Sequence, residues 1–333
     1  MINVGIIGMG TRGQMYAETV EQSNKATVAA VSDVNEGFLE KTKNHFNANG
    51  YTDYKDMFEQ ENLDAVIVAT PDFLHKEPVI LAAKKGIHIM VEKPFSTDME
   101  EAEEMAEAIR QNNVKCLVGF ENRWNSPFVA AKNAVGNGEL GELNTMNSRL
   151  NDSIFVPTKM LKWAANSTPG WFLLSHSIDI ACWLKEKKPT SVFAVGTRKK
   201  LVSMGIDTYD SIQATLTFPD NTHATFTSSW ILPESIPLLY DFKYEIIGEN
   251  GSLNLDLHDQ MVKKTTANYE HVPTLGMPID GRLTAAPSQM LFSFINNISD
   301  NTQPTANEED GLLNAKILNA LHKSVETGNI QHI

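Results

Sequence analysis

Short, mostly unbroken apolar runs alternate with helix-like segments over the first 120 residues of the chain. The runs that read as strands lie at 2–8, 27–32, 64–69, 87–91 and 115–119. A strand buried on both faces gives such a run, and strands that alternate with helices form a parallel, doubly wound sheet. We therefore predict an α/β domain with this architecture over residues 1–120.

The pattern changes after about Phe120. Residues 189–258 contain stretches in which apolar and polar positions alternate, as in 211–218. This alternation predicts a meandering antiparallel sheet that packs on helices with one face and leaves the other open, where a partner subunit could cover it. We expect an α+β domain over residues 121–333, built on an open, mostly antiparallel sheet, with a last amphipathic helix near 308–327 packing back on the body.

Composition and charge narrow the possible functions. The chain has 333 residues, of which 42% are hydrophobic, and a net charge of -13 that makes nucleic acid a poor partner. No apolar run approaches the ~20 residues that span a bilayer, and no export signal is visible at the start, so we expect a cytoplasmic protein away from membranes. Cys116 and Cys182 lie in apolar stretches, which predicts buried free thiols and no metal site.

A glycine-rich motif follows the first strand at once and opens a helix. It reads Gly8-Met9-Gly10-Thr11-Arg12-Gly13. In this context the glycines let the backbone approach a pyrophosphate, and the helix N-terminus offers unpaired N–H groups to the phosphates. The motif predicts that residues 1–120 form an NAD(P)-binding Rossmann domain, with Gly8, Gly10, Thr11, Arg12 and Gly13 at the cofactor.

An acidic residue stands twenty positions after Gly13, at the end of the second predicted strand. Asp33 can accept hydrogen bonds from both hydroxyls of the adenine ribose, and its charge repels a 2′-phosphate. The neighbouring residues 32, 34 and 35 provide no cation to offset that repulsion. We therefore predict NAD, with NADP less favoured.

Two further motifs follow predicted strands at the edge where ligands bind in open α/β sheets. The first supplies Thr70, Pro71 and His75, and the second is the tripeptide Glu92-Lys93-Pro94. The proline restricts the conformation of Lys93, whose ammonium could stabilise an alkoxide or carbonyl oxygen at a reacting carbon. We expect these residues to line the cofactor, with Lys93 also facing the substrate.

Taken in order, these motifs resemble those of the glucose-fructose oxidoreductase / inositol dehydrogenase (Gfo/Idh/MocA) family. The resemblance covers nearly the whole chain and includes 118–123, 176–179 and 246–253. It implies a Rossmann domain followed by an open antiparallel sheet. It also implies a tightly held nicotinamide cofactor, cyclic sugar or polyol substrates, and homodimers or homotetramers formed through the open sheet.

The resemblance implies a catalytic set of a lysine, an aspartate and a histidine four residues after that aspartate. Lys93 and His176 match, but Phe172 occupies the aspartate position. We expect a helix over 171–184 that carries His176 as the general base. Asp179 shares its helical face and is our candidate to orient the imidazole; a buried cap or a partner for Arg149 is the alternative role.

The remaining candidates are polar residues near predicted strand ends or loops. Asn122, Arg123, Asp152 and His258 are candidates for substrate specificity. Trp163 lies in a loop whose family counterparts approach the nicotinamide, although packing is an equal alternative for it.

The sequence therefore predicts an NAD-dependent oxidoreductase that moves a hydride between the cofactor and a cyclic polyol, sugar or sugar derivative. Two alternatives follow from Phe172. One is an enzyme that retains NAD and uses it for elimination or glycoside cleavage without net redox change. The other is an NAD-binding regulator without turnover.

Overall fold

The computed structural model describes residues 1–266 and 268–333, and the chain forms two compact units. The first comprises residues 1–124 and 278–315, and the second comprises 125–277 and 316–333. The predicted boundary at 120 lies close to the observed one, but residues 278–315 belong to the first unit and not to the second. Among the described residues, no helix is both long and apolar enough to cross a membrane.

The first unit is built on a six-stranded parallel sheet, called sheet A here, with the order β3-β2-β1-β4-β5-β6. Its strands are β1 (Ile2–Ile7), β2 (Ala26–Ser32), β3 (Asn49–Tyr51), β4 (Ala65–Val68), β5 (His88–Val91) and β6 (Cys116–Val118). This order is that of the doubly wound Rossmann fold, which confirms the predicted class. The sequence pattern missed β3 because this strand is short and largely exposed.

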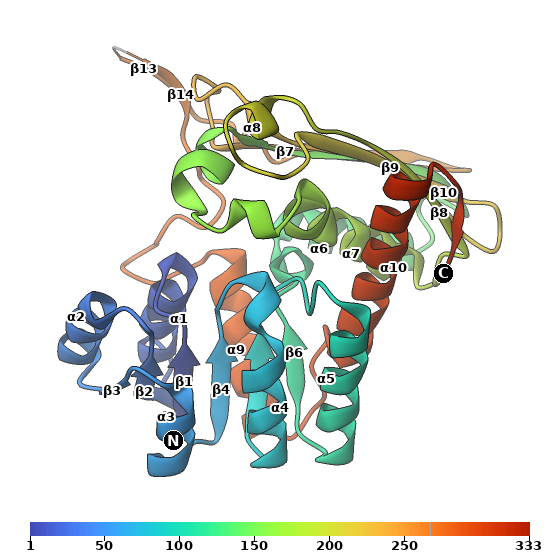
Figure 1. Ribbon diagram of the computed structural model, residues 1–333. Helices are drawn as coiled ribbons and strands as arrows, with labels where there is room; N and C mark the ends of the chain where they lie inside the picture. Colours follow the sequence, from blue (N-terminus) through green and yellow to red (C-terminus); the bar gives the residue numbers. More distant parts are fainter. Residues whose placement is uncertain (267) are drawn as a thin grey trace. The chain divides into compact units, whose positions relative to one another are not determined.

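Helices cover both faces of sheet A, as Figure 1 shows. They are α1 (Thr11–Glu21), α2 (Glu36–Phe46), α3 (Tyr54–Gln60), α4 (Lys76–Lys84), α5 (Met99–Gln111) and α9 (Ala286–Ser299), with short 3₁₀ turns η1 (Asp72–Leu74) and η2 (Glu121–Trp124). One core joins the sheet to α3, α4 and α5, and the other joins it to α1, α2 and α9. Met290, Leu291 and Phe294 of α9 complete that second core, which explains why residues 278–315 belong to this unit.

The second unit contains a seven-stranded sheet, called sheet B here, with the order β12-β11-β7-β10-β9-β8-β15. Its strands are β7 (Leu143–Ser153), β8 (Ser191–Thr197), β9 (Ser211–Thr217), β10 (His223–Leu232), β11 (Tyr240–Gly248), β12 (Ser252–Asp256) and β15 (Gln331–His332). All neighbours pair antiparallel except β7 and β10, so the expectation of a mostly antiparallel sheet is confirmed. It is not a simple meander, because β7 lies between β11 and β10.

Sheet B packs on helices with one face only. The unit's helical elements are α6 (Ser126–Gly136), α7 (Ser175–Lys185), α8 (Lys200–Ser203), the 3₁₀ turn η4 (Ala164–Asn166), and the π-helical turns η3 (Val156–Met160) and η5 (Gly170–Leu174). Phe128 of α6 packs on Phe242 and Tyr244 of β11, with ring centroids 5.3 and 5.7 Å away. The opposite face presents polar and half-exposed side chains such as Gln213 and Thr225.

Two further features complete the chain. A small hairpin of β13 (Lys263–Thr265) and β14 (Tyr269–His271) follows sheet B, and the helix α10 (Glu308–Thr327) contains the point at which the two units divide. Among the described residues neither cysteine forms a disulfide; Cys116 is buried as predicted, whereas Cys182 is only half-buried.

Candidate active site

The glycine-rich loop between β1 and α1 has the form that a phosphate cradle needs. A Cβ added to Gly8, which has a φ of +91°, would lie 2.7 Å from the Ala69 carbonyl oxygen, and one added to Gly13 would lie 1.9 Å from the Gly8 oxygen. The fold itself therefore requires both glycines. At Gly10 an added Cβ would meet no protein atom within 4 Å, so the fold does not require a glycine there. The close approach of a ligand does explain it.

The N-terminus of α1 adds favourable electrostatics to this cradle. Gly10 is the N-cap and provides no side-chain cap, and the first turn contains no acidic residue. The N–H groups of that turn and the helix dipole therefore favour an anion. Thr11 is exposed at the start of the helix. The loop fits the pyrophosphate of a dinucleotide.

Asp33 lies directly after β2, beside the glycine-rich loop. Its Oδ2 accepts a hydrogen bond from the Met9 N–H at 2.6 Å, and its Oδ1 accepts one from the Asn35 N–H at 2.8 Å. These bonds fix the half-buried carboxylate, and each oxygen retains capacity for a further donor. The arrangement fits recognition of a ribose.

His75 connects the turn after β4 to the turn after β5. Its ring is 1% exposed, with Nδ1 3.0 Å from the Pro94 carbonyl oxygen and Nε2 3.2 Å from that of Thr70. The Thr70 hydroxyl donates to the Leu74 carbonyl at 3.4 Å, and Pro71 is half-buried beside it. The ring thus holds the loop that carries Lys93, and the predicted place of His75 at the cofactor stays a prediction.

A group of charged side chains, in which the carboxylates are buried and Arg12 is half-buried, lies at the same edge of sheet A. The Arg12 Nη2 lies 2.8 Å from Glu121 Oε1, and its Nε lies 3.7 Å from Glu92 Oε1. The Tyr16 hydroxyl donates to the same Glu92 oxygen. Sequence reasoning missed Tyr16 and Glu121. The only local signal was the spacing of four between Arg12 and Tyr16, which puts both on one face of α1.

Lys93 adjoins this group and is 8% exposed. Burial lowers the pKa of its ammonium, the Glu92 and Glu121 carboxylates act to raise it, and Arg12 acts to lower it. Asp72, which is 4% exposed and was not among the predicted residues, also acts to raise the Lys93 pKa. A lysine in this setting can place a positive charge beside a developing oxyanion.

In the second unit, His176 is half-buried in the first turn of α7. The predicted helix over 171–184 is not one regular α-helix, because Phe172 lies in the π-helical turn η5 that precedes α7. The two residues therefore lack the simple i,i+4 alignment of an α-helix. The Phe172 ring packs against Trp163 and Trp230, at 6.1 and 6.2 Å between centroids. Such π turns are frequent at functional sites.

A histidine from α10 supports the π-helical turn. The His322 ring stacks on Trp171 with centroids 4.7 Å apart, and its Nδ1 donates to the Leu318 carbonyl at 2.7 Å. Its Nε2 therefore accepts from the Thr168 hydroxyl at 2.7 Å, and the same hydroxyl oxygen accepts from the Trp171 N–H at 3.1 Å. A Cβ on Gly170 would lie 2.8 Å from the His322 ring, so only glycine fits there.

Asp179 is 3% exposed on α7. The Tyr244 hydroxyl of β11 donates to the Ser177 carbonyl at 3.2 Å. Burial raises the Tyr244 pKa, and the Cys182 and Asp179 charges raise it further. Asp179 is thus a buried carboxyl of α7 close enough to act on Tyr244, and its action on His176 remains our proposal.

The specificity candidates have different surroundings. Asn122 is half-buried in η2, and Asp152 is 6% exposed near the end of β7. The Arg123 side chain is 4% exposed, lies 3.0 Å from Asp310, and donates to the Thr305 carbonyl at 2.8 Å. These bonds hold η2 to Thr305 before α10 and to Asp310 in the first turn of α10, and we therefore remove Arg123 from the proposed substrate site.

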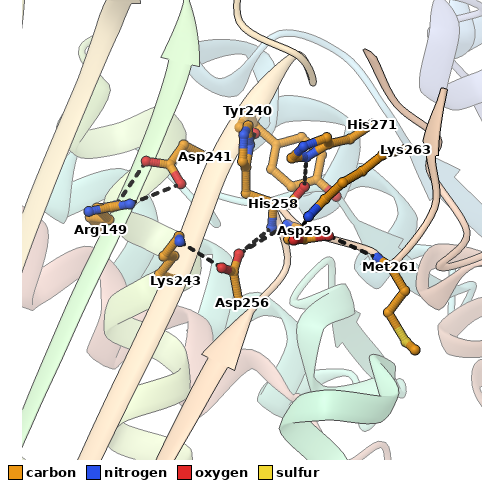
Figure 2. A network of polar contacts seen from close by, with 10 residues as sticks. All are labelled: Arg149, Tyr240, Asp241, Lys243, Asp256, His258, Asp259, Met261, Lys263 and His271. Atoms are coloured by element: carbon orange, nitrogen blue, oxygen red, sulfur yellow. Dashed lines mark hydrogen bonds and ion pairs between the residues drawn. The ribbon is translucent and has the colours of Figure 1, made fainter. Parts of the chain in front are cut away.

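His258 belongs to a polar network around the ends of β11 and β12 (Figure 2). Its Nδ1 lies 2.8 Å from the Tyr240 carbonyl oxygen, and its own carbonyl oxygen lies 2.8 Å from Nδ1 of His271. Ion pairs join Arg149 to Asp241 and Lys243 to Asp256 in the same network. Arg149 thus has Asp241 as its partner, and the role considered for Asp179 as that partner is not needed.

Comparison with known proteins agrees with this geometry. Residues 2–120 match the model of an oxidoreductase family with an NAD-binding Rossmann fold, and residues 128–254 match the GFO/IDH/MocA C-terminal domain. The first match contains the glycine-rich loop, Asp33 and Lys93, and the second contains His176. Together the two matches cover most of the chain.

Individual proteins resemble the chain over most of its length. It is 26% identical to a myo-inositol 2-dehydrogenase of Thermotoga maritima, over 98% of this chain and 96% of that protein. A solved structure of myo-inositol 2-dehydrogenase from Lactobacillus plantarum is 25% identical and covers 100% of this chain and 99% of its own, with a TM-score of 0.88. A 2,7-anhydro-N-acetylneuraminate hydratase of Escherichia coli is 26% identical over 78% of this chain and 68% of that protein. The chain belongs to the Gfo/Idh/MocA family of oxidoreductases, and its N-terminal unit is an NAD-binding Rossmann domain.

Proposed function

We propose that the chain is an NAD-dependent dehydrogenase that oxidises a ring carbinol of a cyclic polyol, sugar or sugar derivative, with an inositol as the first substrate to test. The observation that carries this proposal is the buried Lys93 at the same edge of sheet A as the glycine-rich loop. The similarity to a myo-inositol 2-dehydrogenase over nearly the whole of both chains supports the choice of substrate.

The cofactor would be held by residues of the first unit. The N–H groups at the start of α1 bind the pyrophosphate, and Asp33 accepts from the adenine ribose hydroxyls. When bound, NAD supplies the acceptor for the hydride that leaves the carbinol carbon. Thr70, Pro71 and Glu92 shape the turns beside it, and Trp163 of the second unit is the further cofactor candidate.

The chain's own residues handle the proton and the charge. His176 takes the hydroxyl proton as general base while the C–H bond gives up its hydride and the C–O bond becomes a carbonyl. The Lys93 ammonium stabilises the negative charge that develops on the oxygen. Asp179 holds the imidazole orientation, and Asn122 and Asp152 contact the other hydroxyls of the ring. The open face of sheet B forms the contact of a homodimer or homotetramer, and the protein acts in the cytoplasm.

A substrate panel tests the proposal directly. Myo-inositol, scyllo-inositol and a set of cyclic aldoses are each incubated with the protein and NAD, and reduced nicotinamide is followed by absorbance. We expect turnover with at least one polyol and loss of that turnover in His176→Ala. If no member of the panel is oxidised although NAD binds, the dehydrogenase proposal is wrong.

A second candidate is favoured by Phe172 and by the similarity to a hydratase. It is an enzyme in which NAD stays bound and is restored within each cycle, so that the substrate gains or loses water or an alcohol group without net oxidation. Product formation from an anhydro sugar or glycoside, without accumulation of reduced nicotinamide, would identify this second function. Phe172→Asp separates the two: it should preserve or raise polyol oxidation in a dehydrogenase. If both wild type and Phe172→Asp bind NAD yet convert no substrate, an NAD-binding regulator is the remaining reading.

A further inference from the structure

The buried charges around Arg12 have a role that the glycine motif does not predict. We propose that Arg12, Tyr16 and Glu121 are positioning residues that hold Lys93 in place and set its charge, and that Arg12 is not a phosphate ligand. This inference rests on the proposed function of Lys93. In this arrangement α1, the helix that follows the cofactor loop, supports Lys93 through the Glu92 and Glu121 carboxylates.

The contacts join three segments that are distant in the chain. Arg12 and Tyr16 lie one turn apart on α1, and Tyr16 is fully buried. Tyr16 donates to Glu92 in the turn after β5, while Arg12 lies 2.8 Å from Glu121 of η2, which follows β6. One helical face therefore fixes two neighbouring strand ends at once.

Glu92 transmits this support to Lys93. The Oε2 of Glu92 accepts a hydrogen bond from the Lys93 N–H at 3.1 Å, while Oε1 is held by Tyr16 and Arg12. A Cβ on Gly119 of the adjacent strand end would lie 3.0 Å from Glu92 Oε2 and 3.0 Å from the Lys93 nitrogen. Glycine at this position therefore leaves room for the bonded pair.

The burial of the carboxylates argues against a phosphate role for Arg12. The Glu92 and Glu121 side chains are 8% and 11% exposed, whereas that of Arg12 is 36% exposed. If Arg12 turned to a phosphate, two buried carboxylates would lose one of the cations beside them, which costs more than the loss of an exposed ion pair would. The N–H groups at the start of α1 can bind the phosphates without it.

Arg12 and Glu121 act on the pKa of Lys93 in opposite directions. The charged and titratable groups that face Lys93 or its turn are Glu92 in its own turn, Arg12 and Tyr16 on α1, Asp72 in η1, His75 at the start of α4 and Glu121 in η2. Arg12 disfavours the charged form of Lys93, and Glu121 favours it. Replacing Arg12 by a neutral residue must therefore raise the Lys93 pKa, and replacing Glu121 by a neutral residue must lower it.

The experiment compares Arg12→Met and Glu121→Gln with wild type. The matched control is Arg110→Met, because Arg110 is a 42% exposed arginine of the same unit that pairs with two carboxylates, Glu107 and Glu309. With the substrate found in the panel, we expect kcat of both cluster variants to fall ~10-fold or more, because Lys93 is displaced. The alkaline limb of kcat should move up by ~0.5 pH unit or more in Arg12→Met and down in Glu121→Gln. Arg110→Met should move neither.

A second readout does not depend on turnover. In protein labelled with ¹³C at the lysine Cε, the NMR signal that disappears in Lys93→Met reports the titration of Lys93, and the two variants should shift this titration in opposite directions. The dissociation constant of NAD should change less than ~3-fold in Arg12→Met. If no polyol is oxidised but the titration shifts as expected, the proposed function fails and the positioning role stands.

Two results would overturn the inference. A fall of ~10-fold or more in NAD affinity for Arg12→Met, with partial recovery in Arg12→Lys, would make Arg12 a phosphate ligand. Lys93 titrations that coincide in wild type and both variants would show that the group is structural only. Should Arg12→Met fail to fold, Tyr16→Phe removes only one hydroxyl from Glu92, and its kcat must then fall while NAD affinity is retained.

Discussion

The edge of sheet A and the π-helical turn before α7 support their candidate catalytic residues in different ways. At the edge of sheet A, Lys93 is surrounded by formal charges, with Arg12 between the Glu92 and Glu121 carboxylates. At the π-helical turn, the direct supports are a stacked aromatic pair, a hydroxyl and a histidine that is neutral near pH 7 because burial lowers its pKa to about 4.

This difference follows from the work proposed for each residue. A lysine that stabilises an oxyanion must keep a defined charge, and neighbouring charges set that property. A general base must keep a defined position and tautomer, which rigid packing provides without adding charge. We therefore expect substitutions at the first region to change catalysis or binding through charge, and substitutions of the groups that support the second, such as His322, to act through stability.

The largest effect is expected for Lys93→Met, which keeps the length of the side chain and removes its charge. By analogy with the loss of an oxyanion donor, turnover should fall ~100- to 1,000-fold, which is about 3–4 kcal/mol of transition-state stabilisation. Folding and NAD affinity should be retained, as measured by thermal melting and calorimetry. Normal turnover in this variant would reduce Lys93 to a turn residue and remove the contrast between the two regions.

The next effect concerns the pH dependence of stability at His322. Because the folded pKa of about 4 lies below the ordinary value of 6.5, the unfolded chain binds more protons between these values, and stability is lost as the pH falls from about 6.5 to 4. Allowing for the partial exposure of the ring, this contribution is about 2 kcal/mol.

Urea denaturation of wild type and His322→Gln across this pH range measures the contribution. The difference in unfolding free energy between the two proteins should shrink steadily toward pH 4. His223→Gln is the matched control, because it makes the same replacement at an exposed histidine of β10 in the same unit. A pH-independent difference between wild type and His322→Gln would show that protonation of this ring does not weaken the π-helical turn.

The sequence predicted the local parts of the first region. The strands of sheet A other than β3 were visible because burial on both faces leaves unbroken apolar runs, and the glycine-rich loop and Asp33 follow strand ends directly. Amphipathicity indicates that α9 has an apolar face, but it does not indicate which core receives that face. That is why residues 278–315 were placed in the second unit.

The charged group at Arg12 could not be predicted in the same way. Glu121 lies 109 residues from Arg12, and Glu92 lies 76 residues from Tyr16. Arg123 illustrates the same limit, since its partner Asp310 lies 187 residues further on, and a polar residue near a strand end was expected to face the substrate. The periodicity of 171–184 also could not distinguish a π-helical turn from an α-helix, because a π-helical turn of five residues is too short for its different period to show in the apolar pattern.

The smallest effect tests the other charge at the edge of sheet A, the Asp33 carboxylate. Asp33→Ala removes the acceptor for the ribose hydroxyls and the repulsion of a 2′-phosphate, so NAD should bind ~10-fold more weakly while the preference over NADP narrows. Titration calorimetry with both cofactors measures the two dissociation constants. Asp33 also accepts from the Met9 and Asn35 N–H groups, and the loss of these bonds alone would weaken the binding of both cofactors equally.

Asp33→Asn is the informative companion, because its side-chain oxygen can still accept one of these bonds while the charge is gone. If Asp33→Asn narrows the preference for NAD as much as Asp33→Ala does, charge decides the choice of cofactor. If Asp33→Asn retains the wild-type preference, hydrogen bonding to the ribose decides the choice of cofactor. This part of the sheet edge then acts through the position of its hydrogen-bonding groups and not through their charge, as the π-helical turn does.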